Sequence, residues 1–178
     1  FEFKTYKKPS IMGIANCDLA AAIHCEPNVL RNAISWCIKN KIKLVGHSFL
    51  GAEKRVIKEY LGIDIPLELI EDSMIRHYLL NQDFCKDSGK EEDEEGSYGF
   101  MNLWVTAAQV LDVSQWKSFR GRACEGPCPS HKVFDYCAVD AWASVASVKE
   151  HKKQFKEFGV PEQLYRELIE LSSICDEM

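Results

Sequence analysis

The sequence predicts an α/β fold in which a mixed β-sheet carries helices on both of its faces. Two apolar runs near the start of the chain flank a turn signal, as in a β-hairpin. Several later segments repeat apolar residues at intervals of three and four, the spacing of amphipathic helices. Strands come first and helices then mix with further strands, which is the order of an α/β sandwich. The 178 residues, 46% of them hydrophobic, suffice for one domain with a sizeable core.

The first part of the chain is expected to form strands and one helix. Residues 1–23 are expected to be strands, and their segment SIMGIANCDLAAAI holds two apolar runs around Asn-Cys-Asp at positions 16–18. That turn signal predicts a hairpin. Residues 26–40 place apolar side chains at helical spacing, and Pro27 suits the first turn of this helix.

The middle of the chain alternates short strands and helices. Residues 42–49 predict a short buried strand that runs into a loop, and residues 52–63 predict a helix. A further strand is expected over residues 66–74 and a helix over residues 74–82. The charged, Gly- and Ser-containing segment 85–99 is expected to be a solvated loop.

The second half of the sequence is mostly helical. Residues 100–113 predict a helix, residues 119–131 an irregular loop rich in Gly, Pro and Cys, and residues 131–155 a long helix. Residues 161–178 predict a final amphipathic helix. Its inward stripe is expected to consist of Leu164, Leu168, Leu171 and Ile174 or Cys175.

Charge and composition exclude some classes of protein. The net charge of −5 argues against a protein that wraps nucleic acid by bulk electrostatics, but not against an enzyme that grips a few phosphates. No apolar run is long enough to span a bilayer, and no targeting segment starts the chain. Eight cysteines at mostly irregular spacing favour a reducing compartment without disulfides. We therefore expect a globular cytoplasmic protein with no membrane partner.

Acidic residues in apolar surroundings are candidates for phosphoryl chemistry. Two-metal hydrolysis needs several carboxylates from different elements, and Mg²⁺ or Mn²⁺ suits such an oxygen-rich site. Asp140 lies in an otherwise apolar helix, one turn after Tyr136, so the two side chains share a face. The alternative for Asp140 is a core aspartate paired with an arginine or a backbone group.

Two further acids stand near helix starts. Glu53 follows the strand KLVGHSF, and its alternative is a carboxylate favoured by the dipole at a helix N-terminus. Asp72 ends the strand PLELIED, and its alternative is the N-cap of the next helix. Each acid is a weak signal when taken alone.

These segments together resemble a known family. An acidic first strand is followed in order by VGHSFLGAEKRVI, IEDSMIRHYLL, FMNLWVTAAQVLDV and YCAVDAWASV. The series resembles the 3′–5′ exonucleases of the ribonuclease H-like superfamily whose third motif is Tyr-x-x-x-Asp, such as the proofreading domains of phage-type DNA polymerase I relatives. The resemblance covers nearly the whole chain. It implies a three-layer fold with a central mixed β-sheet, and hydrolysis of single-stranded DNA 3′ ends with two Mg²⁺ or Mn²⁺ ions.

The resemblance also implies a set of site residues. Glu2, position 4, Glu53 and Asp140 would bind the metal ions, and Tyr136 would orient the attacking water. The family's first strand carries Asp-x-Glu, whereas this chain has Glu2 and Lys4. Its second motif normally ends in Asp, and Glu53 is the acid available here. Lys4 removes a ligand and places a cation where a metal ion would bind, so it is a candidate site-blocking residue.

The resemblance further divides the chain into residues 1–160, the exonuclease-like domain, and residues 161–178, a C-terminal helix. That helix is similar to the one that joins a proofreading domain to its polymerase domain, and the chain starts abruptly within its first strand. We therefore expect an excised or partial proofreading domain. Its partner would be a fused or associated DNA polymerase domain in a bacterial or phage-infected cell.

A second candidate metal site lies in the loop CEGPCPSH. Cys124, Cys128 and His131 give the spacing C-x3-C-x2-H, which offers three ligands for a structural zinc ion. Such a site takes four ligands, and Cys85 or His151 would be a distant fourth. The alternative is two thiols that pack or bond to each other.

Basic and aromatic side chains are candidates for nucleic-acid contacts. Lys117 and Arg120 are candidates to contact phosphates, and the alternative is that they are simply solvated. His47, beside the second motif, either joins them or bonds to loop backbone. Trp104 and Trp142 have apolar neighbours and are expected in the core.

Three functions fit the residues. The first is an exonuclease whose activity is reduced by the departures at Glu2, Lys4 and Glu53. The second is a catalytically inactive pseudo-exonuclease that binds nucleic acid or stabilises a polymerase. The third is an RNA 3′-end trimming enzyme that acts alone. Lys4 is the residue that separates the first two.

Overall fold

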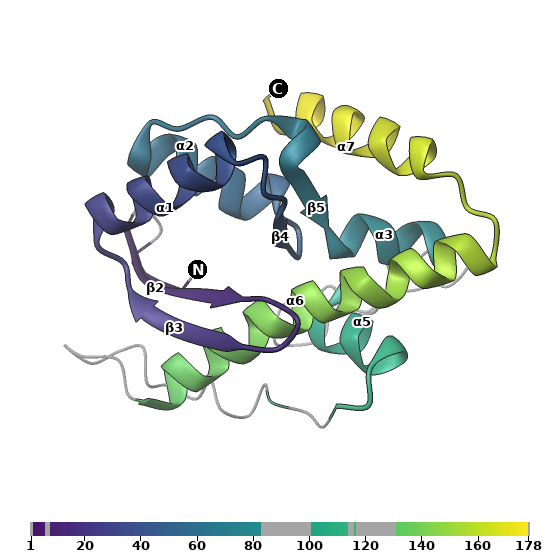
Figure 1. Ribbon diagram of the computed structural model, residues 1–178, viewed down its shortest axis with the longest axis horizontal. Helices are drawn as coiled ribbons and strands as arrows, with labels where there is room; N and C mark the ends of the chain where they lie inside the picture. Colours follow the sequence, from purple (N-terminus) through teal and green to yellow (C-terminus); the bar gives the residue numbers. More distant parts are fainter. Residues whose placement is uncertain (1, 6–7, 83–100, 114–115, 117–130, 178) are drawn as a thin grey trace.

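The computed structural model confirms the α/β class. A small antiparallel sheet, a short parallel pair and a set of helices surround one long helix that crosses the molecule (Figure 1). None of the helices in the described part of the chain is long and apolar enough to cross a membrane. The structure describes residues 2–5, 8–82, 101–113, 116 and 131–177, and side chains within residues 11–82, 101–113, 116 and 133–175.

The three N-terminal strands form an antiparallel sheet in the order β1-β2-β3. They are β1 (Glu2–Thr5), β2 (Lys8–Ala15) and β3 (Ala20–His24). The predicted hairpin is confirmed, because the tight turn between β2 and β3 is closed by Asn16. Its side chain accepts the backbone N–H of Leu19 at 2.7 Å, and its own N–H donates to the Leu19 carbonyl.

The other two strands form a parallel pair. They are β4 (Leu44–Gly46) and β5 (Ile70–Asp72), and their last residues lie opposite each other. The connection between them contains the predicted helix, α2 (Arg55–Leu61), which ends at Gly62 in the left-handed region, with φ 68°. Because the strands are parallel, the chain leaves both of them at the same edge.

The predicted strand over residues 66–74 is much shorter in the structure. Leu67–Leu69 form a 3₁₀ turn, and α3 (Ser73–Leu80) begins directly after β5. The side chain of Asp72 accepts the backbone N–H groups of Met74 and Ile75, so it caps α3 and ends the strand.

The predicted helices are confirmed within the described residues, with somewhat different ends. They include α1 (Pro27–Lys39), with its proline in the first turn, and α5 (Leu103–Val110), capped by the side chain of Asn102. The long helix is α6 (His131–Glu157), and the last is α7 (Glu162–Glu177). The predicted loop over residues 85–99 lies outside the described residues.

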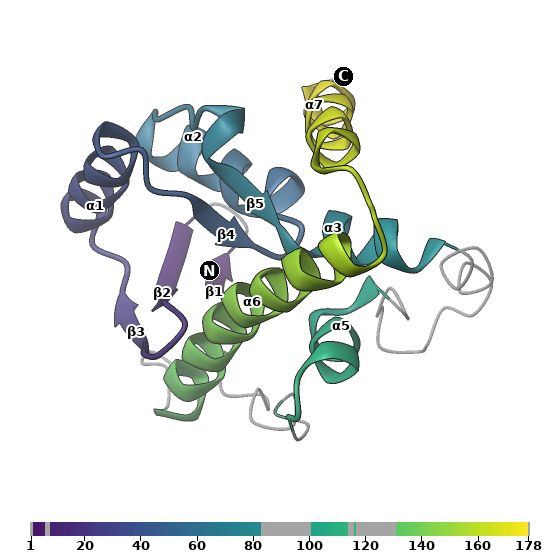
Figure 2. The same ribbon diagram turned by 45° about the vertical axis from the view of Figure 1, so that its right-hand side comes forward.

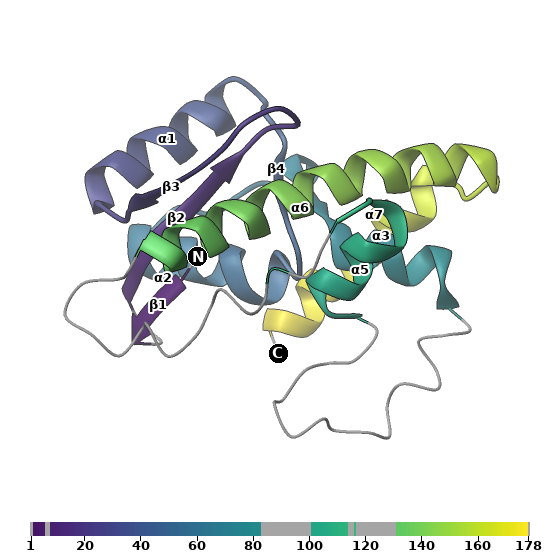
Figure 3. The same ribbon diagram turned by 90° about the horizontal axis from the view of Figure 1, so that it is seen from below.

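Helix α6 touches both halves of the fold. It packs on β2 and β3 at one end and on α3 and α5 towards the other, and it also contacts β4 (Figure 3). Gly13 of β2 lies directly against it. A Cβ atom at Gly13 would stand 2.3 Å from the Cys137 carbonyl oxygen and 2.9 Å from the Ala141 Cβ. The sheet and the helix therefore meet backbone to backbone.

The core is divided among three groups of buried side chains. The largest joins α1, α2, α3 and α7 around the parallel strands, and a smaller one lies between the hairpin and α6. The α5–α6 cluster consists of Leu103, Ala107, Trp116, Tyr136 and Ala143. Trp104 and Trp142 pack against this cluster, which confirms their expected place in the core.

The expected inward stripe of α7 is wrong. Leu171 and Ile174 are 56% and 59% exposed, and Leu164 and Cys175 are also exposed. Only Leu168 of the predicted stripe packs on the core. The buried face instead carries Tyr165, Ile169 and Ser173. The helix has apolar residues on two faces, and polar contacts of Tyr165 decide which face turns inward.

Those polar contacts belong to a buried charged group centred on Glu71 of β5. Arg76 donates to Glu71 Oε2 at 2.7 Å, while Lys152 and Arg166 donate to Oε1 at 3.1 Å and 2.5 Å. Burial alone would raise the pKa of Glu71, but the three cations hold it below its ordinary value. The Arg76 guanidinium also lies 3.8 Å from the ring centroid of Tyr165, a cation–π contact that fixes α7.

Replacing Gly13 by Ala should destabilise the protein because the new methyl group meets α6 backbone. We expect a loss of at least about 1–3 kcal/mol in the free energy of unfolding, measured with urea. Gly51→Ala is the control, because the nearest atom to its Cβ would be Ser48 Oγ at 3.5 Å. Equal stability of the two variants would contradict the close contact between β2 and α6.

Replacing Arg76 by Met should destabilise the fold strongly. The change leaves the buried Glu71 carboxylate with a bare Oε2, and removal of one partner of a buried ion pair costs about 3–5 kcal/mol. The control is Lys153→Met, because Lys153 pairs with Glu150 on the surface and is 63% exposed. Urea unfolding of both variants measures the difference, and a loss below about 1 kcal/mol for Arg76→Met would refute the importance of the pair.

Candidate functional site

Three acidic side chains from separate elements form the candidate site. Glu53 belongs to the π-helical turn Leu50–Lys54 that follows β4, Asp72 ends β5, and Asp140 lies on α6. They are brought together because β4 and β5 end at one edge and α6 packs on β4. The negative charges of Asp72 and Asp140 both act on Glu53.

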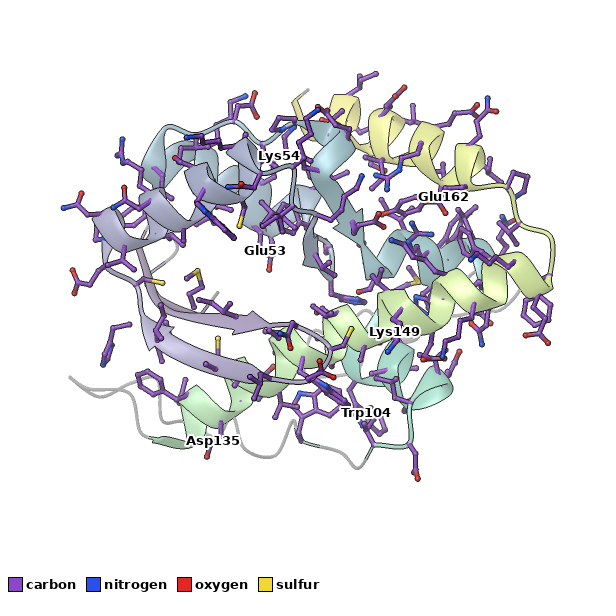
Figure 4. The ribbon with its side chains drawn as sticks, viewed as in Figure 1. Glu53, Lys54, Trp104, Asp135, Lys149 and Glu162 are labelled. Atoms are coloured by element: carbon purple, nitrogen blue, oxygen red, sulfur yellow. The ribbon has the colours of Figure 1, made fainter. Side chains whose placement is uncertain are left out.

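Glu53 has the most unusual surroundings of the three. Its Oε2 atom is buried and has no hydrogen-bond partner among the described residues. Burial, followed by the charges of Asp72 and Asp140, raises the pKa of Glu53 to about 7. Figure 4 shows Glu53 directed towards the middle of the molecule and Lys54 on the side of α7, where its Nζ donates to Ser173. Of these two adjacent residues of the turn, Glu53 belongs to the candidate site and Lys54 bonds to α7.

The conformation of the loop after β4 sets the position of Glu53. Ser48 adopts the left-handed region with φ 60°, and the N–H groups of Ser48 and Phe49 donate to the Asp72 carboxylate at 3.1 Å and 2.6 Å. The π-helical turn then begins at Leu50. Such turns are often found at functional sites, because the wider turn displaces one side chain from the regular helical face.

Asp72 is a structural residue. Its two oxygens accept four backbone N–H groups, two from the loop after β4 and two from the first turn of α3. The N-cap alternative is therefore confirmed. Burial raises the pKa of Asp72 in spite of these four donors.

Asp140 is half-buried and bonded to a tryptophan. Its Oδ1 accepts the indole N–H of Trp116 at 2.6 Å, and Trp116 is 3% exposed. The alternative considered for Asp140 was a pairing with an arginine or a backbone group. Its partner is instead the indole of Trp116. Sequence reasoning missed Trp116 as a site residue. The available signal was that a buried tryptophan usually needs an acceptor for its N–H.

Tyr136 lies on the same side of α6 as Asp140, as their spacing predicts. It is 2% exposed and belongs to the α5–α6 cluster together with Trp116. The ring therefore lies in the same buried cluster as the indole that bonds to Asp140. The proposed orientation of a water molecule by Tyr136 stays a prediction.

His47 is bonded within the protein through both ring nitrogens. Nδ1 is 2.9 Å from the Ser73 hydroxyl, and Nε2 is 2.6 Å from the Met101 carbonyl oxygen, to which it donates. The ring thus joins the loop after β4 to the starts of α3 and α5. This is the backbone-bonding role considered above, and contact with nucleic acid stays a prediction.

Several predicted residues lie outside what the structure describes. Lys117, Arg120, Cys124 and Cys128 fall in the segment 117–130. The side chains of Glu2, Lys4 and His131 are also outside the description, although the first two lie on β1 and the third begins α6. Among the described side chains, no group of three or more His, Cys, Asp or Glu is arranged to hold a metal ion.

Comparison with known proteins gives no match. A scan against protein-family models finds none, and searches of curated proteins and of solved structures find none either. The resemblance to the exonucleases therefore depends on the segments quoted above.

The raised pKa of Glu53 predicts a specific pH dependence of stability. The folded state holds this proton up to about pH 7, whereas an ordinary glutamate loses it near pH 4.5. The contribution of Glu53 to the free energy of unfolding should therefore fall as pH rises between these values, by up to about 1.4 kcal/mol per unit, and it is measured as the difference between wild type and Glu53→Gln.

Glu53→Gln should lack this decline, because the amide carries no ionisable proton. Urea unfolding at pH 4 to 8 with a chelator present measures it, and Glu59→Gln on the exposed side of α2 is the control. A constant difference between wild type and Glu53→Gln across the range would show that Glu53 titrates normally.

Proposed function

We propose that this chain is a ribonuclease H-like 3′–5′ exonuclease domain that hydrolyses single-stranded DNA 3′ ends with two Mg²⁺ or Mn²⁺ ions. The observation that carries the proposal is the buried Oε2 of Glu53, which has no hydrogen-bond partner among the described side chains and lies in the electrostatic range of Asp140. A buried carboxylate without a partner costs free energy, and a bound divalent cation would offset it. Both acids occupy the motifs that the resemblance assigns to metal ligands.

The arrangement of the strands supports this proposal. A three-stranded antiparallel meander leads through α1 to a parallel pair, and Figure 2 presents the strands across the view in the order β3, β2, β1, β4, β5. The resemblance implies one mixed sheet with helices on both faces, and the described strands form an antiparallel sheet of three strands and a separate parallel pair.

Each site residue has a defined task in the proposed reaction. Glu53 and Asp140, with Glu2, would hold the ions through carboxylate oxygens, which are the ligands that Mg²⁺ and Mn²⁺ prefer. When bound, the ions lower the pKa of a water molecule and neutralise charge on the phosphate. Asp72 keeps the loop before Glu53 in place through its four N–H bonds. Tyr136 would orient the attacking water.

Lys4 favours a second candidate function. Glu2 and Lys4 both lie on β1, the strand that the resemblance assigns to the first motif. An ammonium group there would pair with Glu53 or Asp140 and occupy the place of an ion. The chain would then be a pseudo-exonuclease that binds nucleic acid or stabilises an associated DNA polymerase in the cytoplasm.

Nuclease assays on a labelled single-stranded DNA distinguish the two candidates. With Mn²⁺ or Mg²⁺ we expect slow shortening from the 3′ end that Asp140→Asn reduces by at least about 100-fold. Asp135→Asn, an exposed acid on the same helix (Figure 4), is the matched control. The combined change Glu2→Asp, Lys4→Glu and Glu53→Asp should raise the rate, because it restores the family's ligands.

The pattern of results assigns the function. Tight DNA binding without shortening, in the wild type and in the combined variant, would replace the first candidate by the second. Activity that Asp140→Asn leaves unchanged would disprove the proposed site. Preference for an RNA oligonucleotide over DNA would indicate 3′-end trimming of RNA.

A further inference from the structure

We propose that Trp116 is a positioning residue for Asp140. Its indole N–H fixes Oδ1 of the carboxylate, so that the other oxygen, Oδ2, is presented to a divalent cation. The inference rests on the function proposed above, because it assumes that Asp140 is a metal ligand. It concerns a contact that the exonuclease motifs in the sequence do not contain.

The geometry of the contact is that of a strong hydrogen bond. The distance of 2.6 Å from Nε1 to Oδ1 is just below the usual range for N–H donors, and bonds to a carboxylate are shorter than those to neutral acceptors. An indole has one N–H and no acceptor, so it can bond to Asp140 only as a donor. The bond therefore occupies one oxygen of the carboxylate and leaves the other oxygen to bind a cation.

The indole itself is held by packing from two helices. Trp116 belongs to the α5–α6 cluster, with Leu103 and Ala107 from α5 and Tyr136 and Ala143 from α6. A ring with this burial has little rotational freedom, so the position of its N–H is set by the cluster. The Asp140 side chain is thereby fixed at its helix backbone and at one oxygen.

The second oxygen of Asp140 is left for another partner. No described residue donates a hydrogen bond to Oδ2, and the carboxylate is only half-buried. Outer hydrogen bonds that orient metal-binding carboxylates typically change metal affinity by about 10–100-fold when they are removed. Trp116 would have this effect without touching the ion.

The same cluster supplies a matched control. Trp104 also packs against it, but its buried Nε1 has no hydrogen-bond partner among the described residues. Replacement of either tryptophan by Phe removes one indole N–H and a similar volume. Only Trp116→Phe removes the bond to Asp140, so the comparison separates positioning from packing.

Calorimetric titration of the full chain with Mn²⁺ tests the inference. We expect Trp116→Phe to weaken Mn²⁺ binding by about 10-fold or more, Trp104→Phe to leave it unchanged, and Asp140→Asn to weaken it most. Urea unfolding of each variant confirms that it is folded. Binding by Trp116→Phe that equals or exceeds that of Trp104→Phe would overturn the inference, while a loss in Asp140→Asn would leave the proposed function standing.

A second measurement uses the unaltered protein. The chain has four tryptophans, and the indole N–H signal of Trp116 is identified in an ¹⁵N spectrum by its absence from Trp116→Phe, or by elimination among the other three if that variant does not fold. We expect this signal to shift on addition of Mg²⁺ in the wild type and not in Asp140→Asn. If this signal does not shift with Mg²⁺ although the wild type binds Mn²⁺, the inference about Trp116 is overturned and the proposed function is not. A wild type that binds neither ion would overturn the proposed function and the inference together.

Discussion

The buried carboxylate of Glu71 and the cations around it determine how the four elements of this half of the fold fit together. Glu71 lies on β5, and its partners Arg76, Lys152 and Arg166 come from α3, α6 and α7. A charge removed from water loses several kcal/mol unless its partners are close and well oriented. Movement of any one of the three helices would remove one cation from the buried carboxylate, and movement of β5 would remove all three, so the group constrains the four elements together.

The candidate site follows from this constraint through a short series of contacts. Tyr165 lies on α7, and its ring contacts the Arg76 guanidinium. Its hydroxyl oxygen accepts the backbone N–H of Asp72 at 2.7 Å. The Asp72 side chain in turn binds the loop after β4, and that loop leads into the turn that carries Glu53. Glu53 is therefore positioned by a charged group with which it forms no hydrogen bond. Asp140 is brought to the candidate site by α6, the helix whose Lys152 pairs with Glu71.

The features that could be predicted from the sequence are those set by contacts between residues close together in the chain. The Asn16 turn, the proline in the first turn of α1 and the Asp72 cap each act within a few residues, and all three are present as expected. Contacts between distant segments could not be predicted in this way. The inward face of α7 depends on the meeting of Tyr165 with Arg76, and the bond from Trp116 to Asp140 depends on the packing of α5 on α6. Spacing along one helix carries no information about either.

The position of α6 and α7 late in the chain has a consequence for how the protein folds. The first strands pack on α6, and the contact between Asp72 and Tyr165 joins residues 93 positions apart. Contacts of such long range slow folding, because a large loop must close before they stabilise anything. During synthesis the hairpin and the parallel strands emerge long before the helices that cover them. Their apolar surfaces and strand edges stay exposed in that interval, so the nascent chain is prone to aggregate until α6 and α7 have been made.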